Sequence, residues 1–163
     1  MHDAQSREVG STKNVADVYL AHTAPDGRTQ PMTAHAEGCA SRAEMFAAAF
    51  GFGPEGRAAG LFHDTGKYAP GFQARLRGGA PYEHSSAGMY LFAARAEKSW
   101  NPTDILLAYA ISGHHAGLPD TGSRADGEDD DTFCAKMCRR ANALKDFSAY
   151  RTELGDLPVL RPL

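Results

Sequence analysis

The sequence predicts an all-α fold, a helical bundle that carries a metal site among the ends of its helices. Alanine occurs 28 times, whereas valine and isoleucine together occur six times. Alanine favours helices, and β-branched residues favour sheets. Apolar residues also recur at helical spacing in several segments, and histidines gather where those segments end. A chain of 163 residues corresponds to one compact domain.

The predicted organisation is a flexible N-terminus over 1–16, an ordered domain over 17–150, and a C-terminal tail or truncated end over 151–163. The first residues are polar and without periodicity. The last ones contain two prolines that do not suit a helix.

Three helices are predicted in the first half of the chain. They cover 33–50, Pro54 to His63-Asp64, and 70–77, after a turn at 24–27. Proline is a favoured first residue of a helix, and glycines follow the predicted ends. The buried stripe of the first helix is predicted to contain His35, Cys39, Ala43, Phe46 and Phe50.

The second half is predicted to hold three further helices. One begins near 84–86 and turns Met89, Tyr90, Ala93 and Ala94 inward. The next opens with Asn101-Pro102-Thr103-Asp104, which provides a cap, a proline and an early carboxylate, and it ends at Gly113 before His114-His115. The last is predicted over 132–150. Between the last two of these helices, five acidic residues among 126–131 indicate a solvated loop.

Charge and cysteine content exclude several classes of protein. Lysine and arginine number 17 against 20 acidic residues, so the net charge of −3 argues against binding to nucleic acid or membrane through overall positive charge. The longest apolar run, 105–111, is far shorter than the ~20 residues of a membrane span, so no membrane partner and a cytoplasmic location are expected. Three cysteines, an odd number, indicate reduced thiols.

Five of the seven histidines fall at the ends or on the inner faces of predicted helices: His35, His63, His84, His114 and His115. A lone histidine in such a place is usually a core or capping residue. However, His63-Asp64 and His114-His115 each follow an apolar run, and burying charged groups without partners is costly. A metal ion would satisfy them together.

The ligand types indicate one or two divalent transition-metal ions. Imidazoles with a carboxylate suit Fe, Mn, Co, Ni or Zn, whereas cages of oxygen atoms suit Mg and Ca. One ion rarely takes five histidines, but two ions ~3.5–4 Å apart can share them when a carboxylate bridges. Asp64 is the expected bridge. Such ion pairs hydrolyse phosphate esters.

Residues 61–67, Leu-Phe-His-Asp-Thr-Gly-Lys, resemble the signature of the HD metal-dependent phosphohydrolase superfamily. More specifically, 17–120 resembles the HD nuclease domain that opens the CRISPR-associated helicase-nuclease of type I interference systems. The matching pieces are Tyr19–His22, Gln30–His35, Gly60–Lys67, Phe72-Gln73, His84–Gly88 and Gly113–Pro119.

This resemblance implies a ligand set. His35, His63 and Asp64 would hold one ion, and Asp64, His84, His114 and His115 would surround the second. Asp64 and Lys67 are the predicted catalytic residues, with Lys67 stabilising the pentavalent phosphate, although a salt bridge that only holds Asp64 is equally consistent. The family's first ion has a further aspartate on a later helix. The late candidates, Asp146 and Asp156, lack its apolar setting.

The implied function is a metal-dependent nuclease that hydrolyses single-stranded DNA, working with a helicase and a CRISPR surveillance complex. Two alternatives stay open. One is an HD nucleotide phosphohydrolase on the same scaffold. The other is a degenerate HD domain that binds metal or a partner without turnover, a reading favoured by the missing late aspartate.

Overall fold

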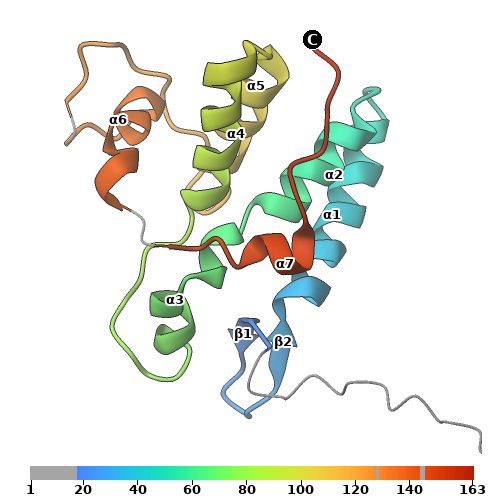
Figure 1. Cartoon of the computed structure of the whole chain (residues 1–163), viewed down its shortest axis with the longest axis vertical. Coiled ribbons are helices and arrows are strands. Elements are labelled where there is room, and N and C mark those ends of the chain that lie inside the picture. Colours follow the sequence, from blue (N-terminus) through green and yellow to red (C-terminus); the bar gives the residue numbers. More distant parts are fainter. Residues whose placement is uncertain (1–17, 128, 144–145) are drawn as a thin grey trace, which may run out of the picture.

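The computed structural model describes residues 18–127, 129–143 and 146–163, so the expectation of a flexible N-terminus over 1–16 lies outside the described residues. The fold is mostly helical, with one small hairpin (Figure 1). The helical elements are α1 (Met32–Ala48), α2 (Gly53–Phe62), the 3-10 helix η2 (Thr65–Tyr68), α3 (Pro70–Arg75), α4 (Ala87–Ser99), α5 (Pro102–Ser112), α6 (Phe133–Ala143) and α7 (Tyr150–Leu154). Within the described residues, no helix is both long and apolar enough to cross a membrane.

The hairpin consists of β1 (Leu20–Thr23) and β2 (Thr29–Pro31), which pair antiparallel. The turn predicted between them is confirmed: the Gly27 N–H donates to the Ala24 carbonyl at 2.9 Å, and Gly27 has φ +84°, which glycine adopts readily. The all-α prediction missed these strands because their few residues leave no trace in the composition of the chain. Their consequence is local, since β1 carries His22 towards α1.

Helices α1 and α2 lie side by side (Figure 1) because small residues line their contact. A Cβ atom at Gly60 would lie 2.6 Å from the Cys39 carbonyl oxygen, so the two backbones approach as closely as glycine allows. The predicted buried stripe of α1 is wrong in its second half: Phe46 is 66% exposed and Phe50 is 78% exposed. The buried residues of α1 are instead Met32, Ala36 and Ala40.

The main core lies between α2, α4 and α5. In α4 the buried positions are Met89, Phe92, Ala93 and Ala96, which keep the helical period, whereas Ala94, predicted inward, is exposed. The rings of Phe62 and Phe92 meet edge to face, with centroids 6.1 Å apart. This packing orients the C-terminal end of α2, where His63 and Asp64 follow Phe62.

The predicted start of α5 is confirmed. The Asn101 side chain accepts a hydrogen bond from the Thr103 N–H at 3.1 Å, as a helix cap does. Asp104 differs from the expectation of a carboxylate that only faces the helix dipole. It is buried, and Arg95 binds it through two hydrogen bonds of 2.8 and 2.5 Å.

The C-terminal third departs most from the prediction. The helix predicted over 132–150 is interrupted, because α6 ends at Ala143 and α7 begins at Tyr150. The segment 151–163, expected as a tail, runs back between the helix pairs (Figure 1) and buries Leu160. Thr103 donates from its hydroxyl to the Arg161 carbonyl at 2.7 Å. Packing therefore shows no boundary at 150.

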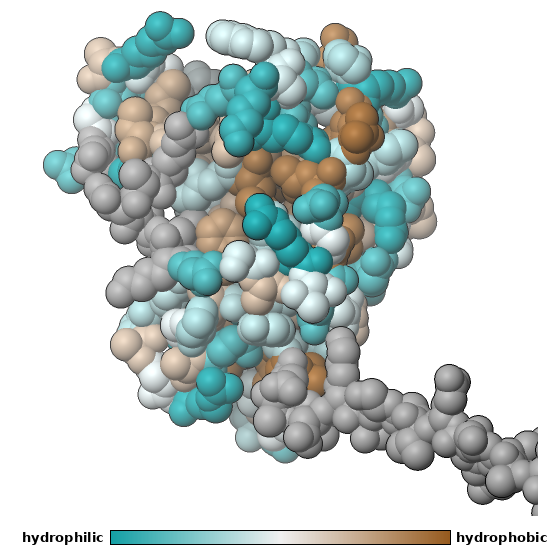
Figure 2. Space-filling view, viewed as in Figure 1, coloured by the Kyte–Doolittle hydropathy of each residue, from teal (hydrophilic) through white to brown (hydrophobic). Residues whose placement is uncertain are grey.

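The acidic loop is exposed as predicted at positions 129–131. On the face seen in Figure 2, hydrophobic residues gather near the centre, and hydrophilic residues surround them.

Candidate metal centre

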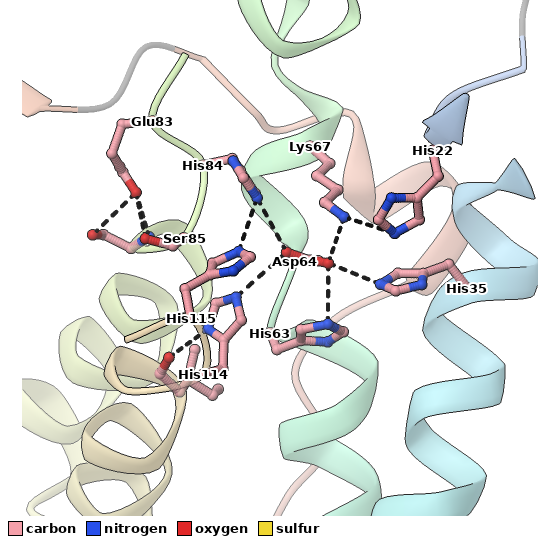
Figure 3. Close-up of polar contacts among 12 residues, drawn as sticks. His22, His35, His63, Asp64, Lys67, Glu83, His84, Ser85, His114 and His115 are labelled. Atoms are coloured by element: carbon pink, nitrogen blue, oxygen red, sulfur yellow. Dashed lines mark hydrogen bonds and ion pairs between the residues drawn. The ribbon is translucent and has the colours of Figure 1, made fainter. Parts of the chain in front are cut away.

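Asp64 occupies the centre of the predicted site (Figure 3). It lies between the end of α2 and the start of η2, and it is only 3% exposed. A bare carboxylate is costly to bury, so its surroundings must supply compensating charge or hydrogen bonds.

One carboxylate oxygen of Asp64 faces three side chains from three different elements. Oδ2 lies 2.8 Å from His35 Nε2, 3.1 Å from His63 Nε2 and 2.9 Å from Lys67 Nζ. His35 comes from the first turn of α1, His63 caps the C-terminus of α2, and Lys67 belongs to η2. His35 and His63 are the two histidines predicted with Asp64 around the first ion, and Lys67 is the predicted catalytic lysine.

The other oxygen faces the second predicted group. Oδ1 lies 3.5 Å from His114 Nε2 and 3.7 Å from His84 Nε2. His84 Nε2 is in turn 3.1 Å from His115 Nε2. The structure therefore brings together all six predicted ligand residues, and the two oxygens of Asp64 divide them into the two expected groups.

Backbone carbonyls fix the ring tautomers of two ligands. His63 Nδ1 donates to the Gly60 carbonyl at 2.8 Å, and His114 Nδ1 donates to the Ile111 carbonyl at 2.6 Å. A carbonyl oxygen can only accept, so in each neutral ring the lone pair belongs to Nε2 and points at Asp64. Metal-binding histidines are commonly oriented by such a bond from the other ring nitrogen.

The residues present fit a divalent cation. Asp64 Oδ1 and His114 Nε2 are both buried and have no hydrogen-bond partner. In the neutral tautomer they are two acceptors that face each other, an arrangement that is unfavourable by itself. A cation between them would accept a lone pair from each. The groups His35–Cys39–His63 and Asp64–His114–His115 each hold ligand atoms within 4.8 Å of one another and are able to hold a metal ion.

The protonation states also suit metal binding. Burial by itself would raise the pKa of Asp64, but the imidazoles of His114, His35 and His63 outweigh it and hold the pKa well below its usual range. Burial lowers the pKa values of His84 and His115, which favours neutral rings, whereas in His114 the contacts with Asp64 and Ile111 outweigh burial and raise the pKa. An ionised carboxylate and neutral imidazoles are the forms that bind metal ions.

Lys67 is buried to 3% exposure beside the carboxylate. Besides Asp64, its Nζ lies 3.2 Å from His22 Nε2. The Gln73 side chain donates to the Lys67 carbonyl at 2.7 Å and so holds the backbone of η2. The salt bridge with Asp64 is therefore present, and the catalytic role of Lys67 stays a prediction.

Two residues at the site were not predicted as part of it. His22, on β1, contacts Lys67 and packs its ring against that of His35, with centroids 5.0 Å apart. Cys39 Sγ lies 4.0 Å from His35 Nε2. The sequence held a signal for Cys39, because it follows His35 by one helical turn. No such spacing points to His22, which reaches the site through the hairpin.

The late acidic candidates lie away from this cluster. Asp146 is exposed and accepts a hydrogen bond from the Ser148 N–H, and the Asp156 side chain is 95% exposed. Among the described residues, neither aspartate joins either ligand group.

The site opens into two hollows. A cleft of about 560 Å³ is bordered by His35, Cys39, Arg42, Phe46 and His63, among others. A second hollow of about 470 Å³ is bordered by Phe72, Arg75 and His84. Both share His22, Lys67 and His115, so the two hollows adjoin at these residues, and Asp64 borders the first of them.

No family model matches the chain, and no curated protein matches it in sequence.

Proposed function

We propose that this protein is a metal-dependent nuclease that hydrolyses phosphodiester bonds of single-stranded DNA, using one or two ions of Fe, Mn, Co, Ni or Zn. The observation that carries the proposal is the setting of Asp64. Its buried carboxylate faces imidazoles on both sides, and Asp64 Oδ1 and His114 Nε2 are left without hydrogen-bond partners.

Asp64 acts as the bridge between two ion sites. His35 and His63 share the first site with Oδ2, and His84, His114 and His115 lie on the side of Oδ1. When bound, such ions activate water and neutralise charge on the reacting phosphate. The protein holds the rings in the required tautomer through the Gly60 and Ile111 carbonyls.

Lys67 supports the reaction as a fixed cation. Its ammonium group borders both hollows and lies 2.9 Å from Asp64 Oδ2. It is thus placed to face a phosphate bound at the site and to stabilise the negative charge that develops on the phosphate oxygens. The same ammonium offsets part of the charge of the buried carboxylate when no substrate is bound.

The shape of the site favours a strand over a small nucleotide. The two hollows adjoin at His22, Lys67 and His115, so a strand that occupies both would lie beside Lys67, and each contains an arginine, Arg42 in one and Arg75 in the other. Phe46 borders the first hollow and is largely exposed, as an aromatic residue that stacks on a base would be.

The net charge of −3 leaves the chain with little overall attraction for DNA. We therefore propose that a helicase, within a CRISPR surveillance complex, delivers the strand. This partner assignment depends on the resemblance to type I HD nucleases.

The test uses protein freed of metal with a chelator and then supplied with Mn(II), Co(II), Ni(II) or Mg(II). We expect cleavage of circular single-stranded DNA with the transition ions and little cleavage with Mg(II), which prefers oxygen ligands. The control variant Asp156→Ala, which changes an exposed side chain, should cleave DNA at the same rate as the unchanged protein. Hydrolysis of free nucleotides without DNA cleavage would favour a phosphohydrolase, and bound ions without any turnover would favour a degenerate domain.

A further inference from the structure

Cys39 belongs to a group of candidate ligands that was not predicted from the sequence. His35 and Cys39 are one turn apart on α1, and His63 comes from the end of α2. Their ligand atoms all lie within 4.8 Å of one another, and Cys39 Sγ is 4.0 Å from His35 Nε2. A thiol and two imidazoles therefore converge beside the carboxylate oxygen that His35 and His63 share.

The distance between Cys39 Sγ and His35 Nε2 is close to that of a loaded tetrahedral site. An ion bound to sulfur at ~2.3 Å and to imidazole nitrogen at ~2.0–2.1 Å places these two ligand atoms roughly 3.6 Å apart. The observed separation between Cys39 Sγ and His35 Nε2 is 4.0 Å, slightly longer than this. A small rotation of one side chain would close the difference. Close packing of Gly60 against the Cys39 carbonyl oxygen holds the backbone of Cys39 in place.

We propose that Cys39 Sγ is a ligand of the ion held by His35 and His63. With Asp64 Oδ2 it completes a set of two nitrogens, one oxygen and one sulfur, so the first site takes a fourth protein ligand without a late aspartate. Sulfur is a soft ligand, so this site prefers Zn(II) or Co(II) over Mn(II) and Mg(II). The inference rests on the metal centre of the proposed function, but it makes a separate claim about one ligand.

The chain offers matched controls. Cys134 and Cys138 lie on α6, and within the described part of the chain neither belongs to a group of ligand atoms. The double variant Cys134→Ser/Cys138→Ser therefore leaves Cys39 as the single thiol of the protein.

The test is a titration of the metal-free double variant with Co(II), followed by absorption spectroscopy. A cobalt–thiolate bond produces a charge-transfer band in the near ultraviolet, which nitrogen and oxygen ligands do not. We expect this band in the double variant and its loss on the further change Cys39→Ser. X-ray absorption of the Zn(II) form should show one sulfur at ~2.3 Å from the metal.

Alkylation of the same double variant by iodoacetamide gives a readout that needs no further substitution. We expect one equivalent of Zn(II) to slow alkylation of Cys39 strongly, because a bound thiolate is shielded. Zn(II) affinity should fall at least ~10-fold in Cys39→Ser, while Mn(II) affinity changes little.

Binding of Co(II) without a sulfur band, together with alkylation that Zn(II) leaves unchanged, would overturn the assignment of Cys39 and leave the proposed nuclease centre intact. Failure to bind any transition ion would overturn both.

Discussion

Asp64 turns one carboxylate oxygen towards His35 and His63 and the other towards His84 and His114. The sequence was sufficient to select these residues, because each histidine falls at the end or on the inner face of a predicted helix. It was not sufficient to select His22, whose position depends on a hairpin of seven strand residues. Nor did it assign a role at the site to Cys39, whose neighbours His35 and His63 come together only through the packing of α1 on α2.

Lys67→Met tests the role of the buried ammonium group. If Lys67 stabilises charge on the phosphate, cleavage should slow by about 10²- to 10³-fold while both ions stay bound. Steady-state cleavage with parallel metal analysis measures this. Lys136→Met, which removes a lysine that pairs with an exposed aspartate, is the control and should keep its rate. An unchanged rate with a lower melting temperature would identify Lys67 as a purely structural partner of Asp64.

The histidines also predict a pH dependence of the metal-free protein. Burial is the main cause that lowers the pKa values of His22, His84 and His115 below about 6.5, the ordinary value. The unfolded chain then binds more protons than the folded one, so the free energy of unfolding should fall as the pH drops from about 7.5 to 5.5.

One histidine acts in the opposite direction. Burial lowers the pKa of His114, but its contacts with Asp64 and Ile111 raise the pKa by more than burial lowers it. His114 therefore offsets part of the loss of stability at low pH. Urea denaturation in chelator across this pH range measures the slope, and His115→Asn should reduce it. Stability that rises on acidification would show that the folded state takes up protons at these rings.

At the scale of elements, close packing of η2 against the loop before α4 positions the second ion site. A Cβ atom at Gly66 would lie 2.8 Å from both the Cα and the carbonyl carbon of His84, closer than atoms can approach. Gly66→Ala should therefore displace His84 and weaken the second ion, while His35 and His63 keep the first. Calorimetric titration with Co(II) resolves the two sites.

Gly38→Ala is the matched control, because a Cβ atom there would meet nothing within 4 Å. It lies within α1 and should leave metal binding unchanged, with a gain in stability of roughly 0.5–1 kcal/mol. Full second-site affinity in Gly66→Ala would show that this contact does not position His84.

The elements that were predicted well have strong local signals at their ends. Proline is the first residue of α3 and α5 and the second of α2, and the Asn101 side chain caps α5. Phe46 and Phe50 were misplaced because helical periodicity marks an apolar face without showing what covers it. The interruption between Ala143 and Tyr150 and the return of 151–163 across the helices depend on tertiary packing, which no local pattern encodes.

At the scale of the whole molecule, the candidate metal centre links segments that are far apart in the sequence. Its candidate ligands come from α1, the end of α2, the loop before α4 and the residues that follow α5. Because ions would bind this arrangement only in the folded chain, each site that is filled at 100 times its dissociation constant should add about 2.7 kcal/mol of stability. For a domain of this size the melting temperature should rise by roughly 5–10 °C for one filled site.

Differential scanning calorimetry with Co(II) and with chelator measures this difference. Asp64→Asn should remove most of it, because both groups of ligands share the carboxylate. A melting temperature that does not respond to any transition ion would contradict the linking role of the centre.

If the Asp64 carboxylate bridges two ions, its loss should release both. Equilibrium dialysis against Co(II), followed by elemental analysis per chain, measures this. We expect two ions for the unchanged protein, a large loss of both in Asp64→Asn, and two ions in the control Asp146→Asn, whose side chain is exposed. Two tightly bound ions in Asp64→Asn, or one ion that this change does not affect, would contradict the bridge.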